Sequence, residues 1–192
     1  MLREWRPAVV ILLGLMAATG LVYPLVLTGI CQVCFNSRAN GSLLYRDGEA
    51  IGSGLIGQPF EDPAYFWGRP SATSAVPYDG AASAGSNLGP SNPALLGAVE
   101  ARVRSLRADH PDGRLRIPVD LVTASASGLD PHISLAAARY QVGRVARARH
   151  LTEAQVDQLV RECSLGRSLG VLGEPVVHVV ELNLALDRLA SR

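Results

Sequence analysis

Residues Pro7 to Ser37 read PAVVILLGLMAATGLVYPLVLTGICQVCFNS, a run of 31 residues without a charged side chain. A helix needs about 20 mostly apolar residues to cross the hydrocarbon core of a bilayer. The apolar part of the run, residues 8–30, meets that length, and no later stretch repeats the pattern. We therefore predict a transmembrane helix over residues 8–30, a juxtamembrane segment over 31–40 and one soluble domain over 41–192.

Two alternatives to a retained membrane anchor stay open. A cleavable signal peptide would explain the arginines before the run and the small residues Met16-Ala17-Ala18. However, the apolar run continues beyond the roughly 7–15 residues usual in such a peptide. A buried core helix would normally keep a polar face, which this run lacks.

The charges that flank the run bear on its orientation in the membrane. Arg3 and Arg6 precede it, and Arg38 and Arg46 follow within about 20 residues, so a count of positive charges gives a tie. The first two arginines lie closer to the span. We therefore expect a cytoplasmic N-terminus and an extracytoplasmic domain.

The composition excludes several classes of function. From Arg38 onward, 16 arginines balance 16 acidic residues, so the domain lacks the basic footprint of a nucleic-acid-binding protein. The chain contains no lysine, which excludes a Walker A loop and a Schiff-base mechanism. Its four histidines lack zinc-ligand spacing. Cys31 and Cys34 at the end of the run either form a local disulfide or remain unpaired as small apolar residues.

The rest of the chain mixes strand-like and helix-like segments. Short apolar pieces around Asp47-Gly48 predict a strand pair, and residues 68–93 form a Gly-, Ser- and Pro-rich loop of a length that is often functional. Capping residues and apolar spacing predict the remaining elements: helices over 93–109, 134–149 and 152–163, a buried strand over 176–180 and a helix over 181–189. Four arginines of the second helix are expected on a solvated face: Arg139, Arg144, Arg147 and Arg149. Because strands and helices do not alternate regularly, we predict an α+β domain attached to one N-terminal transmembrane helix.

Three segments have sequences too specific to result from the overall composition of the chain. They are GSGLIGQ at 52–58 with YFWGRPSA at 65–72, GSNLGPSNP at 85–93, and DLVTASASGLDPHIS at 120–134. With ELNLAL at 181–186, they resemble the C subunit of the bacterial Kdp potassium-transporting ATPase over essentially the whole chain. Two features depart from the family pattern: the Cys31/Cys34 pair stands where aromatic residues and Gln are usual, and His178 where Asn is common.

The resemblance implies a noncatalytic accessory subunit of an ATP-driven, high-affinity potassium uptake complex in the bacterial inner membrane. The family's C subunit is described as an assembly factor and as a catalytic chaperone that raises the affinity of the ATP-hydrolysing subunit for ATP. The implied partners are a potassium-selecting channel-like subunit, the P-type ATP-hydrolysing subunit, a small single-span subunit and membrane lipid. ATP would enter through the ATPase subunit, with no cofactor bound by this chain. An extracytoplasmic domain could change nucleotide affinity only allosterically, and direct contact with nucleotide is the alternative.

The candidate site residues are interface residues. In the loops we select Arg69, Asn87, Asn92 and Asp130, whose alternative role is to cap helices and close turns. In the span we select Gly14 and Ala18, because a small-xxx-small spacing permits close helix packing.

Two other functions fit parts of the sequence. Ser125 or Ser127 with Asp130 and His132 could suggest a hydrolase triad, but the sequence has no G-x-S-x-G nucleophile elbow. We therefore predict no catalytic residue and no metal site. The alternative function is a freestanding membrane-anchored extracytoplasmic binding protein.

Overall fold

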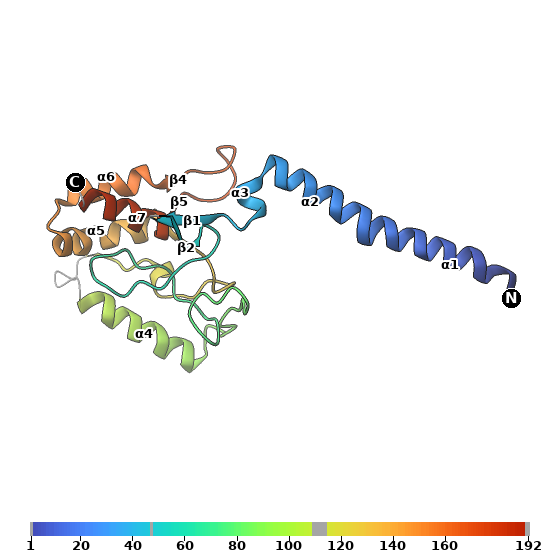
Figure 1. Cartoon of the computed structure of the whole chain (residues 1–192). Helices are drawn as coiled ribbons and strands as arrows, with labels where there is room; N and C mark the ends of the chain where they lie inside the picture. The colour runs from blue at the N-terminus through green and yellow to red at the C-terminus, as the bar shows by residue number, and fades with distance from the viewer. Residues whose placement is uncertain (1, 47, 109–114, 191–192) are drawn as a thin grey trace. The chain divides into compact units, whose positions relative to one another are not determined.

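A computed structural model describes residues 2–46, 48–108 and 115–190 of the chain (Figure 1). The chain divides into two compact units, Met1–Ile51 and Gly52–Arg192.

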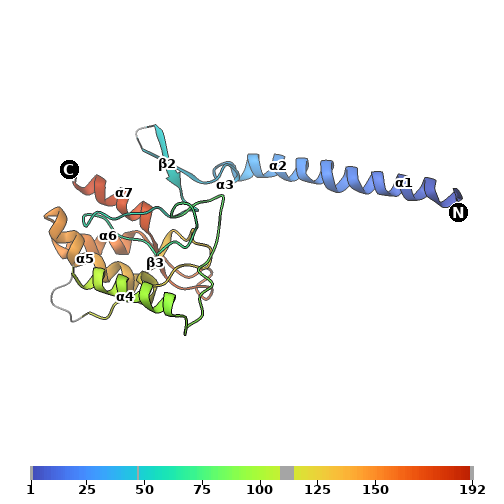
Figure 2. The same cartoon turned by 90° about the horizontal axis from the view of Figure 1, so that it is seen from below.

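The first unit is dominated by a long apolar helix, which Figures 1 and 2 show as one continuous rod. The rod consists of α1 (Leu2–Ala17), a π-helical turn η1 (Ala18–Val22) and α2 (Tyr23–Cys34). The short helix α3 (Asn36–Ala39) follows it. The stretch Glu4–Cys34 is long and apolar enough to cross a membrane. Its most apolar window buries no residue, whereas a core helix would be mostly buried. Cys31 and Cys34 lie in the last turns of α2, exposed and with free thiols.

The π-helical turn has a local cause in the sequence. Pro24 lacks the N–H that would complete the helical hydrogen-bond ladder one turn earlier, and η1 ends two residues before it. Thr19 donates its hydroxyl to the carbonyl of Leu15 at 2.7 Å. A wide turn next to a proline is an ordinary way for a helix to accommodate the missing bond.

A two-stranded sheet follows the apolar helix in the sequence. Strands β1 (Leu43–Arg46) and β2 (Glu49–Ser53) pair with each other. Gly48 between them has φ +86°, a conformation that glycine adopts without steric cost. The predicted strand pair is confirmed.

The second unit packs helices on a small antiparallel sheet. The sheet has the order β3 (His132–Ser134), β5 (Val176–His178), β4 (Ser164–Leu165), with Ile133 opposite Val177. The helices are α4 (Pro93–Ala108), α5 (Leu135–Arg149), α6 (Glu153–Glu162) and α7 (Val179–Ala190), and η2 (Val119–Leu121) is a single 3-10 turn. The mixed α+β content agrees with the prediction, although the strand expected over 176–180 ends at His178, where α7 takes over.

The helix ends follow from their capping residues. Ser134 accepts the N–H of Ala137 at the start of α5, and Thr152 forms a capping box with Gln155 at the start of α6. The core lies between α5, α6, α7 and the sheet, where the largest fully buried apolar side chains are Phe66, Ile133, Val145, Val156, Val160, Val177, Val180, Leu182 and Leu186. The long loop between β2 and α4 covers residues 54–92. Figure 1 shows part of it running between α4 and these three helices.

Candidate functional site

Two buried side-chain amides hold the start of the long loop. The Gln141 amide accepts the Trp67 N–H at 2.8 Å and donates to the Trp67 carbonyl at 3.1 Å. Asn183 does the same for Phe66, at 2.8 and 3.0 Å. Gln141 is fully buried and Asn183 nearly so. Helices α5 and α7 thus each pair with the N–H and the C=O of one residue of the loop, as a neighbouring strand would, and fix the segment that leads to Arg69.

The Gln141 and Asn183 amides form a clamp on the loop, and a buried arginine, Arg144, completes it. The Arg144 guanidinium lies 3.8 Å from the centroid of the Trp67 ring, and it donates to the Gln141 carboxamide oxygen at 2.6 Å and to the Tyr65 carbonyl at 3.0 Å. The expectation of a solvated face is therefore wrong for Arg144, because the loop supplies both an aromatic face and carbonyl acceptors. Arg139 and Arg147 on the same helix are exposed. The expectation is wrong for Arg149 too, because its side chain is only 11% exposed and pairs with Asp187 at 2.8 Å.

The long loop is also fastened to the 120–134 segment. Ser71 donates its hydroxyl to the Gly128 carbonyl at 2.7 Å and accepts the Tyr78 N–H at 2.9 Å. The Ala84 N–H donates to the Ser127 carbonyl at 3.0 Å. Hydrogen bonds between distant loops hold the backbone as secondary structure would. The first and third sequence motifs, with Ala84 just before the second, therefore form one surface.

Arg69 and Asp130, both selected from the sequence, meet at the centre of this surface. The guanidinium Nη1 lies 3.3 Å from the Asp130 Oδ2, and Nη2 donates to the Ala124 carbonyl at 3.2 Å. The Arg69 Nε is buried without a partner among the described residues. Asp130 also accepts the backbone N–H of His132 at 3.0 Å and lies 3.3 Å from its ring Nδ1. Burial alone would raise the pKa of Asp130, but the hydrogen bonds from His132 and the charge of Arg69 lower it overall.

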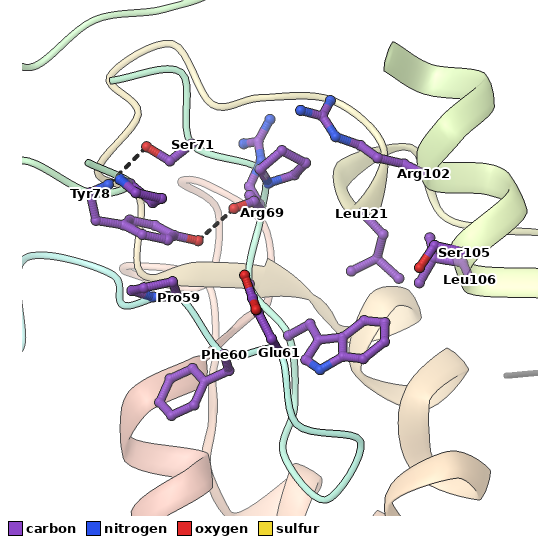
Figure 3. A pocket seen from close by; sticks show the side chains of 14 residues that line it. Pro59, Phe60, Glu61, Arg69, Ser71, Tyr78, Arg102, Ser105, Leu106 and Leu121 are labelled. Carbon is purple, nitrogen blue, oxygen red and sulfur yellow. Dashed lines mark hydrogen bonds between the residues drawn. The ribbon is translucent and has the colours of Figure 1, made fainter. Parts of the chain in front are cut away.

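Tyr78 locks this pair to the loop. Its hydroxyl donates to the Arg69 carbonyl, as Figure 3 shows. Burial and the nearby Asp130 charge raise the pKa of Tyr78 to about 12, against the opposing charge of Arg69, so the phenol stays protonated as a donor. A Cβ on Gly57 would overlap the Tyr78 ring. This contact explains why a glycine stands there in the first motif.

The serines of the third motif close turns. Ser125 accepts the Gly128 N–H at 2.9 Å, and Ser127 accepts the Leu129 N–H at 3.2 Å. Asp130 holds the backbone and ring of His132, as described above. Each group of the weighed hydrolase triad therefore has a structural role in this turn.

The remaining selected residues lie elsewhere. Asn92 accepts the Ala94 N–H at 2.9 Å and so caps α4, and Asn87 is exposed with φ +52°, which asparagine tolerates better than most residues. Both precede α4 and stand outside the Arg69–Asp130 contact. Gly14 and Ala18 lie on the apolar helix of the other unit.

A pocket of about 480 Å³ opens beside Arg69 (Figure 3). It is lined by Pro59, Phe60, Glu61, Trp67, Gly68, Arg69, Pro70, Ser71, Pro77, Tyr78, Arg102, Ser105, Leu106 and Leu121. Arg102 comes from α4 and donates to the Val122 carbonyl at 2.9 Å, and burial lowers its pKa. We did not select Arg102 or Tyr78 from the sequence, because each gains its role from a contact with a distant segment.

The described residues define a class of protein: one helix able to span a membrane and one α+β domain whose long loops form a hydrogen-bonded, polar surface beside a pocket. Comparison with known proteins identifies the family. The sequence model of the family described as "KdpC: K+-transporting ATPase, c chain" matches residues 5–188. The chain belongs to the KdpC family.

Similar proteins cover nearly the whole chain. A protein of Sorangium cellulosum is 63% identical over 187 residues, which are 97% of this chain and 98% of the relative. A protein of Dechloromonas aromatica is 58% identical over 186 residues, 97% of each chain, and one of Methylococcus capsulatus is 54% identical over 189 residues, 98% of this chain and all of the relative. Each of the three is named a potassium-transporting ATPase KdpC subunit.

Proposed function

We propose that this chain is a noncatalytic accessory subunit of an ATP-driven, high-affinity potassium uptake complex. In this proposal it is needed for assembly and acts as a catalytic chaperone that raises the affinity of the ATP-hydrolysing subunit for ATP. The observation that carries the proposal is the family match over residues 5–188, which includes both the apolar helix and the whole loop surface. The partners are a potassium-selecting channel-like subunit, the P-type ATPase subunit and a small single-span subunit.

The two units have separate roles in this proposal. Residues 8–30 span the inner membrane and dock with other membrane helices through Gly14 and Ala18. Residues 31–40 connect the span to the domain, 41–192, which faces the extracytoplasmic side. There Arg69 and Asp130 contact a partner subunit, and Asn87 and Asn92 extend that interface. ATP binds the ATPase subunit, so the effect on its affinity travels through the complex as a coupling free energy.

Detergent extraction separates this proposal from a freestanding binding protein. An affinity tag at the C-terminus of this chain, co-expressed with the three other subunits, should retain all of them on the resin after the membranes are solubilised. Elution of the chain alone, from membranes that contain all four subunits, would favour the freestanding alternative.

Orientation and nucleotide contact need their own measurements. Alkaline phosphatase fused to the C-terminus should be active, whereas an inactive but stably expressed fusion would reverse the proposed topology. The full chain, purified without partners, should bind ATP weakly or not at all. Tight and specific binding would replace the allosteric route by direct contact.

A further inference from the structure

The pocket beside Arg69 carries its positive charge on one side. Figure 3 shows the guanidinium ends of Arg69 and Arg102 at the same side, whereas Glu61 lies toward Pro59 and Phe60. Two cations that face one opening repel each other unless an anion lies between them or beside them. Asp130 supplies that anion for Arg69.

Arg102 differs from Arg69 in this respect. Among the described residues its hydrogen-bond partner is the Val122 carbonyl, and no carboxylate forms an ion pair with it. Its side chain is half-buried, and burial disfavours its charged form enough to lower its pKa. A partly desolvated guanidinium paired only with a neutral acceptor is a strong binding site for a carboxylate, which can take two parallel N–H donors.

The other walls of the pocket suit a protein side chain. Phe60, Trp67, Leu121 and several prolines line it, and its volume of about 480 Å³ exceeds what one anionic group would fill. Aromatic walls beside a half-buried arginine resemble the composition found at the energetic centre of protein interfaces. The backbone below is held by the Gln141 and Asn183 amides, so the pocket is formed before any partner arrives.

We propose that this pocket receives an acidic side chain, Asp or Glu, from a loop of a partner subunit, and that Arg102 is its main ion-pair partner. The inserted loop would pack its apolar atoms against Phe60 and Trp67, with its carboxylate on the arginine side of the pocket. Arg69, already paired with Asp130, adds a second positive charge nearby. This inference rests on the proposed function, since it requires a partner subunit.

The test reverses the charge at Arg102 and, as a matched control, at Arg104. Both arginines lie on α4, and Arg104 is exposed. The tagged full chain is co-expressed with the other subunits, extracted, and washed at rising salt. We expect R102E to retain about tenfold less partner than the wild type, and R104E to stay within about twofold of it. Revertants of R102E selected on low potassium should map to an Asp or Glu of a partner subunit changed to Lys or Arg.

The outcomes separate this inference from the proposed function. Failure of the wild-type chain to retain partners would remove the proposed function itself. Wild-type retention with equal retention by R102E would overturn the pocket inference alone, as would equal losses in R102E and R104E. If R102E fails to fold by thermal melting, R102Q removes the charge and keeps a side-chain donor. Retention by a folded R102Q at the wild-type level through the salt series would overturn the inference, and an R102Q loss of about fivefold or more would support it.

Discussion

Arg69 and Asp130 are 61 residues apart in the sequence, yet their side chains form an ion pair at 3.3 Å on the loop surface. The contact joins the first and third sequence motifs. Because Arg69 also donates to the Ala124 carbonyl at 3.2 Å, one side chain holds the third motif at two points.

The hydrogen bonds from His132 and the ion pair with Arg69 make the stability of the domain depend on pH. The pKa of Asp130 is lower in the folded chain than its ordinary value, so the folded carboxyl binds a proton less readily than the unfolded one. Its contribution is complete above the ordinary pKa of about 3.9 and is lost as the pH falls through the lower, folded value.

Asp130→Asn should therefore lower the free energy of unfolding by about 1 kcal/mol at pH 7. The free energy of unfolding of this variant should also fall less steeply than that of the wild type as the pH is lowered. Urea unfolding of the detergent-solubilised chain, followed by tryptophan fluorescence between pH 7 and pH 3, measures both effects. The control is Glu100→Gln, an exposed carboxylate on α4, which should keep the wild-type profile. A steep acid decline in Asp130→Asn equal to that of the wild type would contradict this interpretation.

The Gln141 clamp should be the most sensitive polar contact of the fold. Gln141→Ala leaves the Trp67 N–H and carbonyl without their partners and opens a cavity, so we expect a loss of about 2–4 kcal/mol. Gln158→Ala on α6 removes an exposed glutamine that donates to Glu162, and should cost less than about 0.5 kcal/mol. Chemical unfolding of the two variants gives the comparison, and similar small losses in both would mean that the clamp is not needed.

Gly57 tests the packing of Tyr78. Gly57→Ala adds a methyl group where the Tyr78 ring lies, so the ring and the Arg69 carbonyl to which it is bonded must shift, at a cost of about 1–3 kcal/mol. Gly89→Ala is the matched control, because nothing lies within 4 Å of its added Cβ. Thermal melting should separate the two variants by several degrees, and coincident melting curves would refute the close approach.

Much of the domain could be predicted from local signals. Asn92-Pro93 marked the start of α4, the Thr152 box marked α6, and Asp47-Gly48 marked the first hairpin, because caps and turns depend on neighbouring residues. The strands β3 and β4 are three and two residues long, which is too short to show the alternation of apolar and polar residues that marks a strand. They form only by pairing with β5. The burial of Arg144 depends on Trp67, which lies on a loop far away in the sequence. Arg69 and Asp130 were selected singly, and only the fold brings them together.

The apolar helix allows assembly to be tested apart from folding. A Cβ on Gly14 would meet no atom of this chain within 4 Å, so Gly14→Leu should leave the domain intact. If Gly14 and Ala18 dock against another helix, this variant should retain about tenfold less partner after extraction, because close packing needs small residues. Ala8→Leu adds bulk roughly 120° around the helix and should retain partners normally. Normal retention by Gly14→Leu would place the helix contact on another face.

The central claim is that this chain is the accessory subunit on which the activity of a potassium-transporting ATPase depends. The most direct measurement is the potassium-stimulated ATPase activity of the other three subunits, co-expressed with and without this chain, over a range of ATP concentrations. We predict that omission of the chain either prevents recovery of the complex or raises the KM for ATP and removes the stimulation by potassium. An intact complex with unchanged stimulation and unchanged KM in the absence of the chain would contradict the claim.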